Sequence, residues 1–359
     1  MNRVALVHDY LNQRGGAERV FAHIARAYPD APVYTALFDP KATGDLVDPA
    51  RVRTSYLARI PGANRIFRYL APFYPRAFEA FDLSGYDTVV SSTTAWAKGV
   101  IVRPDAVHVC YINTVSRFAF AYDRYVGGLG AKRLVRPVVA SLVAWDKRAA
   151  QRPTLFVANS RNVADRIARY YDRDATVLPC PVDVDRFTVG AGTGEYFLIA
   201  SRLLPYKRID LAIEASRLAN VPLLIAGTGP DEARLRALAE RTSTARLLGY
   251  VSDEKLDGLL GNARAAILPG EEDFGLVPLE AAASGRPTIA YRAGGALETI
   301  VEGETGEYFD EATPQSLADA LRGFDSSRYE ARRLRAHAEE FSPPRFIERL
   351  RAIVAAARA

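Results

Sequence analysis

The chain has 359 residues, of which 49% are hydrophobic and 25% charged, which is enough for two domains with packed cores. Only two cysteines are present, Cys110 and Cys180, which excludes a disulfide framework, and no apolar run approaches the ~18 residues of a membrane span. The net charge of +5 divides into +9 for residues 1–190, with 26 Lys/Arg and 17 Asp/Glu, and −4 for residues 191–359, with 21 and 25.

The basic first half restricts the classes of partner. Such a charge suits nucleic acid, an anionic membrane or an acidic substrate. No zinc-finger, RNP-type or basic-zipper pattern accompanies it, so nucleic acid ranks last and we expect none as a partner. The N-terminus runs directly into a predicted strand and has no signal-peptide core, which favours a cytoplasmic protein.

Apolar runs predict the parallel strands of the first half, at residues 4–7, 33–38, 87–91, 107–112 and 155–159. Gly15 and Gly16 follow the first run and open an amphipathic helix that we expect to end near Tyr28. Glycines at a strand–loop–helix junction let the backbone approach a phosphate, which the N–H groups of the helix start then face. The spacing is not that of the G-x-G-x-x-G dinucleotide fingerprint.

The stretch from Arg51 to Phe81 combines six arginines with leucines and aromatic residues, and it has no acidic residue before Glu79. One interpretation is a pair of helices on an anionic membrane surface, with the arginines at the lipid phosphates. The other is an ordinary basic helical hairpin packed on its domain. Three prolines break the stretch into short pieces, and the sequence leaves both interpretations open.

A linker rich in proline and glycine, at residues 179–195, divides the chain. We place the first domain at residues 1–188 and the second at residues 189–342. Apolar runs predict strands of the second domain at residues 196–201, 223–226, 247–251, 265–268 and 287–291. Because strands and helices alternate in both halves, we expect an α/β fold with two doubly wound, Rossmann-like domains that face a central cleft.

Two glutamates mark the most specific stretch, residues 267–309, which reads as a strand, a Pro-Gly turn, an acidic loop and a helix that begins near Leu276. Glu272 lies in the loop and Glu280 lies eight positions later. If a helix covers this interval, both carboxylates lie near one face.

The backbone around the predicted helix start suits an anion. The N–H groups of Phe274, Gly275 and Leu276 would point out of this helix end, where the dipole favours negative charge. A carboxylate beside an anion-binding helix end suits a sugar joined to a phosphate.

With its Glu-Asp-Phe-Gly-Leu core, this stretch resembles the Glu-seven residues-Glu signature of the retaining GT-B glycosyltransferases, family 4-like and polysaccharide mannosyltransferase-like. The resemblance extends over essentially the whole chain. It implies a GT-B fold with an acceptor-binding first domain, a nucleotide-sugar-binding second domain, and a final helix at residues 343–359 that crosses back to the first domain.

The resemblance also implies roles for individual residues. Arg202 and Lys207, in an Arg-x-x-x-x-Lys segment, would clamp the donor diphosphate, whose negative charge grows as it departs. Glu272 would bind hydroxyls of the donor sugar and Glu280 the ribose. The remaining donor contacts would come from backbone at Tyr250, Val251, Phe274, Gly275 and Leu276 and from the loop of Gly15 and Gly16.

One position departs from the resembled pattern. Relatives often read Tyr-x-His-Thr-Pro-x-Arg-Tyr, whereas residues 111–118 read Tyr-Ile-Asn-Thr-Val-Ser-Arg-Phe, so Asn113 stands where His is common. Asparagine donates and accepts hydrogen bonds but carries no charge. Asn113 remains a catalytic candidate with Glu272, Arg202 and Lys207, and its presence also motivates an alternative, a catalytically silent GT-B-type partner.

The resemblance implies a retaining, front-face transfer from a nucleoside-diphosphate sugar, with GDP-mannose favoured and a UDP-sugar next. The acceptor is a hydroxyl of a glycan, a lipid-linked sugar or a small-molecule metabolite. We expect no cofactor besides this co-substrate and no metal, since the four histidines form no ligand-spaced cluster with a cysteine. A nicotinamide-dependent oxidoreductase is less favoured, and the place of action is the cytoplasm or the inner face of the plasma membrane.

Overall fold

The structure is a computed structural model that describes residues 3–116, 132–190 and 194–358. The chain forms two compact units, unit 1 with residues 1–180 and 344–359, and unit 2 with residues 181–343. The division precedes the boundary expected at residue 188 because the intervening backbone packs on unit 2. The N–H of Val182 donates to the carbonyl of Phe341 at 2.9 Å, and the N–H of Gly190 donates to the carbonyl of Ser284 at 3.2 Å.

Unit 1 is built on a seven-stranded parallel sheet with the order β3-β2-β1-β4-β5-β6-β7. Its strands are β1 (Val4–His8), β2 (Val33–Thr35), β3 (Val52–Thr54), β4 (Thr88–Thr93), β5 (Val107–Ile112), β6 (Leu155–Ala158) and β7 (Ala175–Val177). Its helices are α1 (Gly16–Ala27), α2 (Pro40–Thr43), α3 (Ala63–Ile66), α4 (Tyr74–Glu79), α7 (Lys132–Ala149), α8 (Arg161–Tyr171) and α16 (Pro343–Ala356). Short 3-10 turns are η1 (Pro49–Arg51), η2 (Tyr56–Arg59), η3 (Phe67–Phe73) and η4 (Ala97–Gly99).

Unit 2 is built on a six-stranded parallel sheet with the order β10-β9-β8-β11-β12-β13. Its strands are β8 (Phe197–Ala200), β9 (Leu223–Ala226), β10 (Ala245–Gly249), β11 (Ala265–Leu268), β12 (Thr288–Tyr291) and β13 (Gly306–Phe309). Its helices are α9 (Ile209–Ala219), α10 (Glu232–Ala239), α11 (Asp253–Asn262), α12 (Leu276–Ala283), α13 (Ala296–Thr299), α14 (Pro314–Gly323) and α15 (Ala331–Glu339). Its 3-10 turns are η5 (Val184–Arg186), η6 (Pro205–Lys207) and η7 (Ser326–Arg328).

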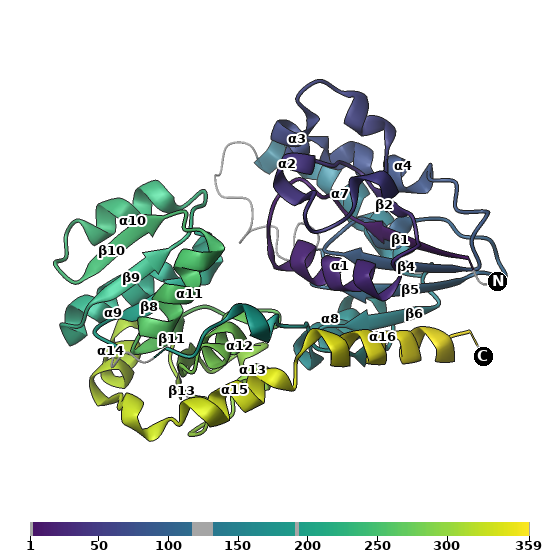
Figure 1. Cartoon of the computed structure of the whole chain (residues 1–359). Helices are drawn as coiled ribbons and strands as arrows, with labels where there is room; N and C mark the ends of the chain where they lie inside the picture. Colours follow the sequence, from purple (N-terminus) through teal and green to yellow (C-terminus); the bar gives the residue numbers. More distant parts are fainter. Residues whose placement is uncertain (1–2, 117–131, 191–193, 359) are drawn as a thin grey trace. The chain divides into compact units, whose positions relative to one another are not determined.

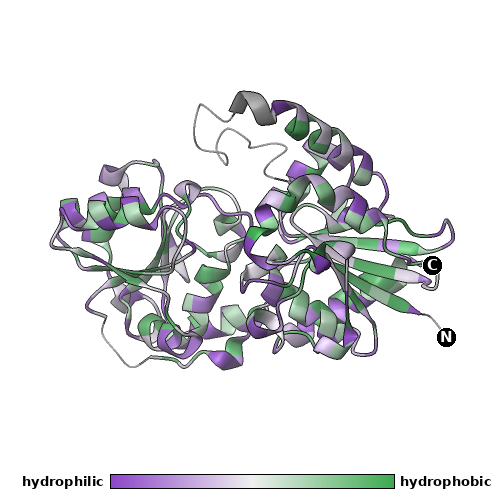
Figure 2. Ribbon diagram, turned by 90° about the horizontal axis from the view of Figure 1, so that it is seen from above, coloured by the Kyte–Doolittle hydropathy of each residue, from purple (hydrophilic) through white to green (hydrophobic). Residues whose placement is uncertain are grey.

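The central strands are buried on both faces, as continuous apolar runs predict. Every residue of β4 and of β11 is buried, and the strands of the unit 1 sheet are mostly hydrophobic in Figure 2. Separate hydrophobic clusters fill the two units, with Phe197 and Ile225 in unit 2 and Val89 and Phe78 in unit 1. The prediction of two doubly wound α/β domains is therefore confirmed.

The same strand order repeats in both sheets and fixes where a ligand can bind. The first strand of each unit in the chain lies inside its sheet, with β1 between β2 and β4 and β8 between β9 and β11, so the strand order reverses direction there. In open parallel sheets, ligands bind outside the carboxyl ends of the strands at such a switch point. The loops after β1 and β4 meet there in unit 1, and the loops after β8 and β11 meet there in unit 2.

The main differences from prediction lie at the sheet edges. The stretch that opens at Arg51 was expected to be helical, but it first forms the edge strand β3, which pairs with β2. The edge strand β13 was not predicted, and β10 ends at Gly249 instead of Val251. Short edge strands carry little periodicity, so pairing with a neighbouring strand decides them.

The last helix, α16, belongs to unit 1 (yellow in Figure 1). The ring of Phe346 contacts that of Tyr111 with centroids 5.8 Å apart, and the guanidinium of Arg351 donates to the carbonyl of Ala27 at 2.7 Å. These contacts tie the C-terminal end of the chain to β5 and α1. Within the described ranges, we found no helix with both the length and the apolar character needed to cross a bilayer.

Candidate active site

Three loops of unit 2 pack together at the carboxyl ends of β8, β9 and β11, and glycines allow their close approach. A methyl group on Gly270 would lie 2.6 Å from the carbonyl oxygen of Tyr206, and one on Gly227 would lie 1.9 Å from that of Ser201. A methyl group on Gly229 would lie 2.3 Å from the carbonyl oxygen of Leu203. Backbone contact this close excludes any side chain, so the three loops hold one another in place.

Lys207 and Glu272 form an ion pair across two of these loops. Lys207 lies at the end of η6, after β8, and Glu272 lies in the loop after β11. Their side chains are 18% and 12% exposed, so the pair is shielded from most of the solvent but remains reachable. The structure thus brings together two of the residues that were predicted as catalytic.

The start of α12 lies four residues after Glu272. Gly275, at the N-cap, has φ of +90°, a left-handed conformation that favours glycine, and no side chain caps this helix end. Pro278 in the first turn has no N–H group, and the first amides of any helix have no partner within it. The N–H groups predicted to face an anion therefore belong to an uncapped helix start.

A glycine turn after β12 supports the loop that leads into α12. The N–H of Gly295 donates to the carbonyl of Glu272 at 2.8 Å. A methyl group on Gly295 would lie 2.3 Å from the Cα of Phe274, whose ring is buried and lies 6.2 Å from that of Phe341. These contacts fix the backbone between Glu272 and Gly275.

The expectation of an acidic loop that holds Glu272 and of a helix that begins near Leu276 is confirmed, whereas the condition that one helix covers both glutamates is not met. The helix begins only at Leu276, so Glu280 lies on α12 and Glu272 lies in the loop before it. Glu280 is half-buried. The physical reason is the left-handed Gly275, which ends the loop and sets a new chain direction at the helix start.

Three further predicted donor contacts, Arg202, Tyr250 and Val251, lie in the same unit. Arg202 follows β8 and its side chain is exposed. Tyr250 and Val251 follow the edge strand β10, and Tyr250 is among the most exposed aromatic side chains of the described residues. Both segments leave the carboxyl edge of the unit 2 sheet, where the neighbouring loops also lie.

In unit 1, Gly15 is the N-cap of α1 and Gly16 its first residue, as the glycine pattern predicts. The carboxylate of Glu18, which sequence reasoning missed, folds back over this helix start. A methyl group on Gly15 would lie 2.6 Å from Oε2 of Glu18, and Nε2 of Gln13 donates to its Oε1 at 3.2 Å. Burial raises the pKa of Glu18 to about 7.

Asn113 lies at the end of β5 and is almost fully buried. Its Nδ2 donates to Oγ of Ser92 at 3.1 Å and to the carbonyl of Thr93 at 3.3 Å, while Nδ2 of Asn159 donates to its carbonyl at 2.9 Å. Its side chain therefore ties β4 to β5. Two residues of the quoted motif, Arg117 and Phe118, lie outside the described residues.

The buried carboxylate of Asp9 organises the switch point of unit 1. It follows β1 and accepts hydrogen bonds of 2.7–3.0 Å from Thr93, the last residue of β4, and from the next four residues, Thr94, Ala95, Trp96 and Ala97. A carboxylate that accepts so many donors fixes both segments. An acidic residue directly after a buried strand was the sequence signal that could have indicated it.

A second buried network was also missed. Nζ of Lys98 lies 2.6 Å from Oδ1 of Asp146, and both side chains are at most 1% exposed. The hydroxyls of Ser116 and Tyr171 donate to the same carboxylate at 2.5 and 2.8 Å. The network joins the segment after β4 to α7 and α8. Because a buried charge needs a partner, we assign these side chains a structural role.

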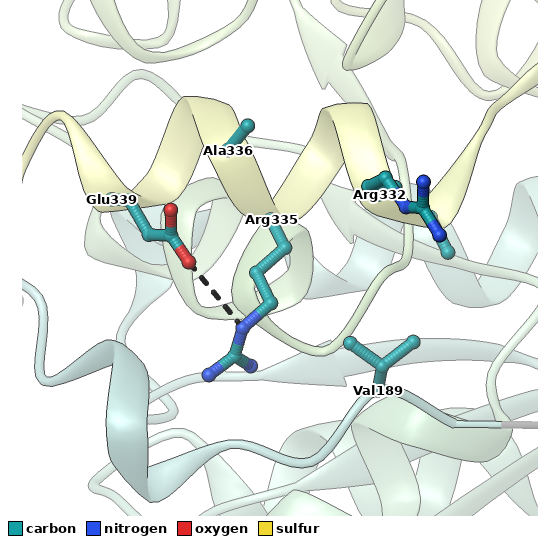
Figure 3. Close-up of a pocket in the computed structure, with 6 residues that line it drawn as sticks. Val189, Arg332, Arg335, Ala336 and Glu339 are labelled. Carbon is teal, nitrogen blue, oxygen red and sulfur yellow. Dashed lines mark ion pairs between the residues drawn. The ribbon is translucent and has the colours of Figure 1, made fainter.

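A separate hollow of about 430 Å³ lies beside α15 and is shown in Figure 3. It is lined by Val189, Ala331, Arg332, Arg335, Ala336 and Glu339, with Nε of Arg335 3.6 Å from Oε1 of Glu339. The guanidinium of Arg335 also donates to the carbonyls of Phe187 and Ala283. None of the predicted site residues lines this hollow.

Across the described part of the chain, no cluster of three or more His, Cys, Asp or Glu side chains is placed to hold a metal ion.

Comparison with known families accounts for almost the whole chain. Residues 14–186 match the model of Glycosyltransferase Family 4, and residues 183–341 match that of Glycosyl transferases group 1. These ranges contain the glycine loop of α1, Asn113, and the Arg202, Lys207 and Glu272 segments.

The chain is also similar to curated glycosyltransferases. A D-inositol 3-phosphate glycosyltransferase of Geodermatophilus obscurus is 30% identical over 255 residues, which are 62% of this chain and 57% of the relative. A GDP-mannose-dependent alpha-(1-6)-phosphatidylinositol monomannoside mannosyltransferase of Mycolicibacterium smegmatis is 28% identical over 231 residues, 54% of this chain and 60% of the relative. The chain thus spans little more than half the length of the curated relatives it matches.

Solved structures show the same fold. The sucrose-phosphate synthase of Thermosynechococcus elongatus superposes with a TM-score of 0.75 at 19% identity, covering 99% of this chain and all of that one. Anabaena Alr3699/HepE in complex with UDP and glucose superposes with a TM-score of 0.71 at 17% identity, with the same coverage. Since the two family matches together run from residue 14 to residue 341 and the fold agrees, the chain belongs to the GT-B glycosyltransferases of the family 4 type.

Proposed function

We propose that this chain is a retaining glycosyltransferase that moves a sugar from a nucleoside-diphosphate sugar to a hydroxyl group of an acceptor. The observation that carries the proposal is the Lys207–Glu272 pair beside the uncapped start of α12, at the switch point of the unit 2 sheet. A cation, a carboxylate and helix-start amides in one place suit a ligand that carries both a diphosphate and sugar hydroxyls.

In this proposal the ion pair opens when the donor binds. The diphosphate replaces Glu272 as the partner of Lys207, with Arg202 and the amides of Gly275 and Leu276 as further donors. Glu272 then accepts hydrogen bonds from the sugar hydroxyls. The pair therefore keeps both side chains in position before the ligand arrives, which lowers the cost of ordering them.

The remaining donor contacts come from the neighbouring segments. Glu280 binds the ribose hydroxyls, and the backbone at Tyr250 and Val251 contacts the base. Unit 2 is thus the proposed donor-binding unit and unit 1 the proposed acceptor-binding unit.

The proposed reaction proceeds on one face of the sugar. The bond between the anomeric carbon and the β-phosphate oxygen breaks, the acceptor oxygen bonds to the same face, and the departing phosphate accepts the hydroxyl proton. Negative charge grows on the departing diphosphate, so fixed cations at Lys207 and Arg202 stabilise the transition state more than the ground state. On this account the two side chains do the work of a metal ion, and we propose no cofactor besides the co-substrate.

GDP-mannose is the first choice of donor and a UDP-sugar the second. The mycobacterial relative is GDP-mannose-dependent by name, whereas the Anabaena structures hold UDP. The proposed acceptor is a hydroxyl of a glycan, a lipid-linked sugar or a small metabolite. We propose action in the cytoplasm, with peripheral attachment to the inner face of the plasma membrane.

The test is turnover of GDP-α-mannose and UDP-α-glucose with alkyl glycosides and inositol as acceptors. The released nucleotide gives the rate, and NMR of the product gives the configuration at the anomeric carbon. An α-linked product supports retention, and a β-linked product contradicts it. No turnover of either donor with any acceptor counts against the transferase proposal.

The hydrogen bonds of Asn113 favour a second candidate, a catalytically silent partner of GT-B type. The side chain is committed to Ser92 and Thr93, which suits a structural role in place of a catalytic one. If this candidate is correct, the wild-type chain binds nucleotide without transfer, or binds none. Family membership sets aside the nicotinamide-dependent oxidoreductase.

A further inference from the structure

Exposed apolar side chains are concentrated in one short segment of unit 1. Among the described residues, eleven large hydrophobic side chains are exposed, and five of them fall between residues 56 and 73. Their exposed fractions range from 37% to 83%, and they are Tyr56, Ile60, Ile66, Tyr69 and Phe73. The segment runs through η2, α3 and η3, which lie with α4 in the upper part of unit 1 in Figure 1.

These side chains are exposed although the segment is firmly packed. Its inner side places Leu57, Leu70, Tyr74 and Phe78 in the core of unit 1. The hydroxyl of Tyr74 donates to the carbonyl of Phe67 at 2.7 Å. The segment thus places apolar side chains both in the core and at the surface, and no element of the described chain covers the exposed ones.

All charged side chains between residues 49 and 78 are positive. Arg59, Arg65, Arg68 and Arg76 are exposed, and no acidic residue occurs between Asp48 and Glu79. Glu79 itself forms an ion pair with Arg152, with Nη2 of Arg152 lying 2.6 Å from Oε1 of Glu79. Within the described ranges, none of these four arginines takes part in an ion pair. We call these four arginines and the five apolar side chains the arginine–aromatic face.

The other two arginines of the stretch, Arg51 and Arg53, donate hydrogen bonds to backbone carbonyls. Nη2 of Arg51 donates to the carbonyl of Tyr28 at 2.7 Å, and Nη1 of Arg53 donates to that of Ala50 at 3.0 Å. Arg51 therefore fastens the edge of the sheet to the end of α1. Of the six arginines in the stretch, the four on the arginine–aromatic face are the ones left for an external anion.

We propose that the arginine–aromatic face docks unit 1 on an anionic membrane surface. Guanidinium groups bind lipid phosphates, and tyrosine and phenylalanine side chains settle at the level of the headgroups. Charge complementarity selects the membrane as the occupant, because a protein partner or a second copy would have to supply a purely acidic face for four arginines. This inference goes beyond the proposed transfer reaction and does not depend on it.

The test is co-sedimentation of the full chain with vesicles of phosphatidylcholine, with and without phosphatidylglycerol. The wild-type chain should bind only the anionic vesicles and should detach as the salt concentration rises. The variant R65Q/R68Q should partition roughly fivefold more weakly for each arginine removed. The variant Y69S should also bind more weakly but keep the salt dependence.

Matched controls use exposed residues elsewhere in unit 1. Arg169→Gln on α8 and Ile101→Ser, after η4, should bind vesicles like the wild-type chain. Nucleotide binding by calorimetry should be the same for all variants, which separates loss of docking from loss of fold.

Several outcomes overturn the proposal. They are absence of wild-type binding to anionic vesicles, equal binding by R65Q/R68Q, and self-association that Y69S abolishes while vesicle binding is absent. Vesicle binding without any nucleotide binding would leave the docking intact and count against the transferase instead.

Discussion

At the scale of single residues, the candidate site is defined by side chains that already have partners inside the protein. Lys207 is paired with Glu272, and the first turn of α1 is covered by Glu18. Each pairing keeps a charged group in place, and in the proposed mechanism a ligand replaces only the first. Substitutions at these positions therefore separate binding from folding.

Replacement of Lys207 by alanine should lower kcat/KM by roughly 10²–10³-fold, because a fixed donor to the departing phosphate is lost. The midpoint of thermal unfolding should fall as well, since the carboxylate of Glu272, which is only 12% exposed, loses this cation, but the chain should stay folded at about 25 °C. Steady-state kinetics and thermal denaturation measure both effects. Lys255→Ala, at an exposed position of α11, is the control and should leave kcat/KM unchanged.

Glu18 should make the free energy of unfolding depend on pH. Burial raises its pKa in the folded chain from the ordinary 4.5 to about 7, so between these values the folded state binds a proton that the unfolded state has released. Stability therefore falls as pH rises through this window and is constant above it. Glu18→Gln keeps an acceptor at the helix start but removes the titration.

The stability of Glu18→Gln relative to the wild-type chain should accordingly rise between about pH 4.5 and pH 7. The expected total change is about 1–3 kcal/mol. Urea denaturation at a series of pH values measures it. Parallel pH profiles of the two proteins would show that the Glu18 carboxyl is not the titrating group.

At the scale of elements, parallel strands place the loops and glycines set how closely they pack. The turn at Gly295 supports the loop from Glu272 to Gly275 through a backbone hydrogen bond. Its φ of −67° is open to any residue, so close packing alone requires glycine there. The helix start that is proposed to bind phosphate thus depends on a turn after the next strand.

Gly295→Ala should displace this loop, because the added methyl group would lie 2.3 Å from the Cα and 2.4 Å from the carbonyl oxygen of Phe274. We expect a loss of about 1–3 kcal/mol in stability and weaker nucleotide binding. Denaturation and calorimetry measure the two quantities. In the control, Gly258→Ala on α11, the methyl group meets nothing within 4 Å and should stabilise by about 0.5–1 kcal/mol. Unchanged nucleotide affinity in Gly295→Ala would refute the supporting role of the turn.

At the scale of the whole molecule, two doubly wound parallel sheets could be predicted because buried parallel strands have continuous apolar runs in the sequence. The runs at β5, β9 and β11 were placed to the residue. The edge strand β3 could not be predicted, since Val52–Thr54 has only three residues and becomes a strand only through pairing with β2.

In the candidate site, too, features set by neighbouring residues could be predicted, whereas contacts between residues far apart in the sequence could not. The left-handed Gly275 and the helix start at Leu276 are local and follow from glycine and proline positions. The ion pair of Lys207 with Glu272 joins residues from different βα units, and so does that of Lys98 with Asp146. From the sequence, Lys98 beside a glycine would be taken for a surface residue, and only the folded chain shows that it is buried.

The most direct measurement of the central claim is calorimetry of the wild-type chain with GDP, UDP, ADP and dTDP in the presence of a chelator. A nucleotide that binds the folded chain also raises its thermal midpoint by mass action, which provides an independent readout. We predict that one nucleotide, GDP first, binds without added metal and that Lys207→Ala strongly weakens this binding. Binding of none of the four, or undiminished binding by Lys207→Ala, would contradict the assignment of the diphosphate site to Lys207 and the start of α12.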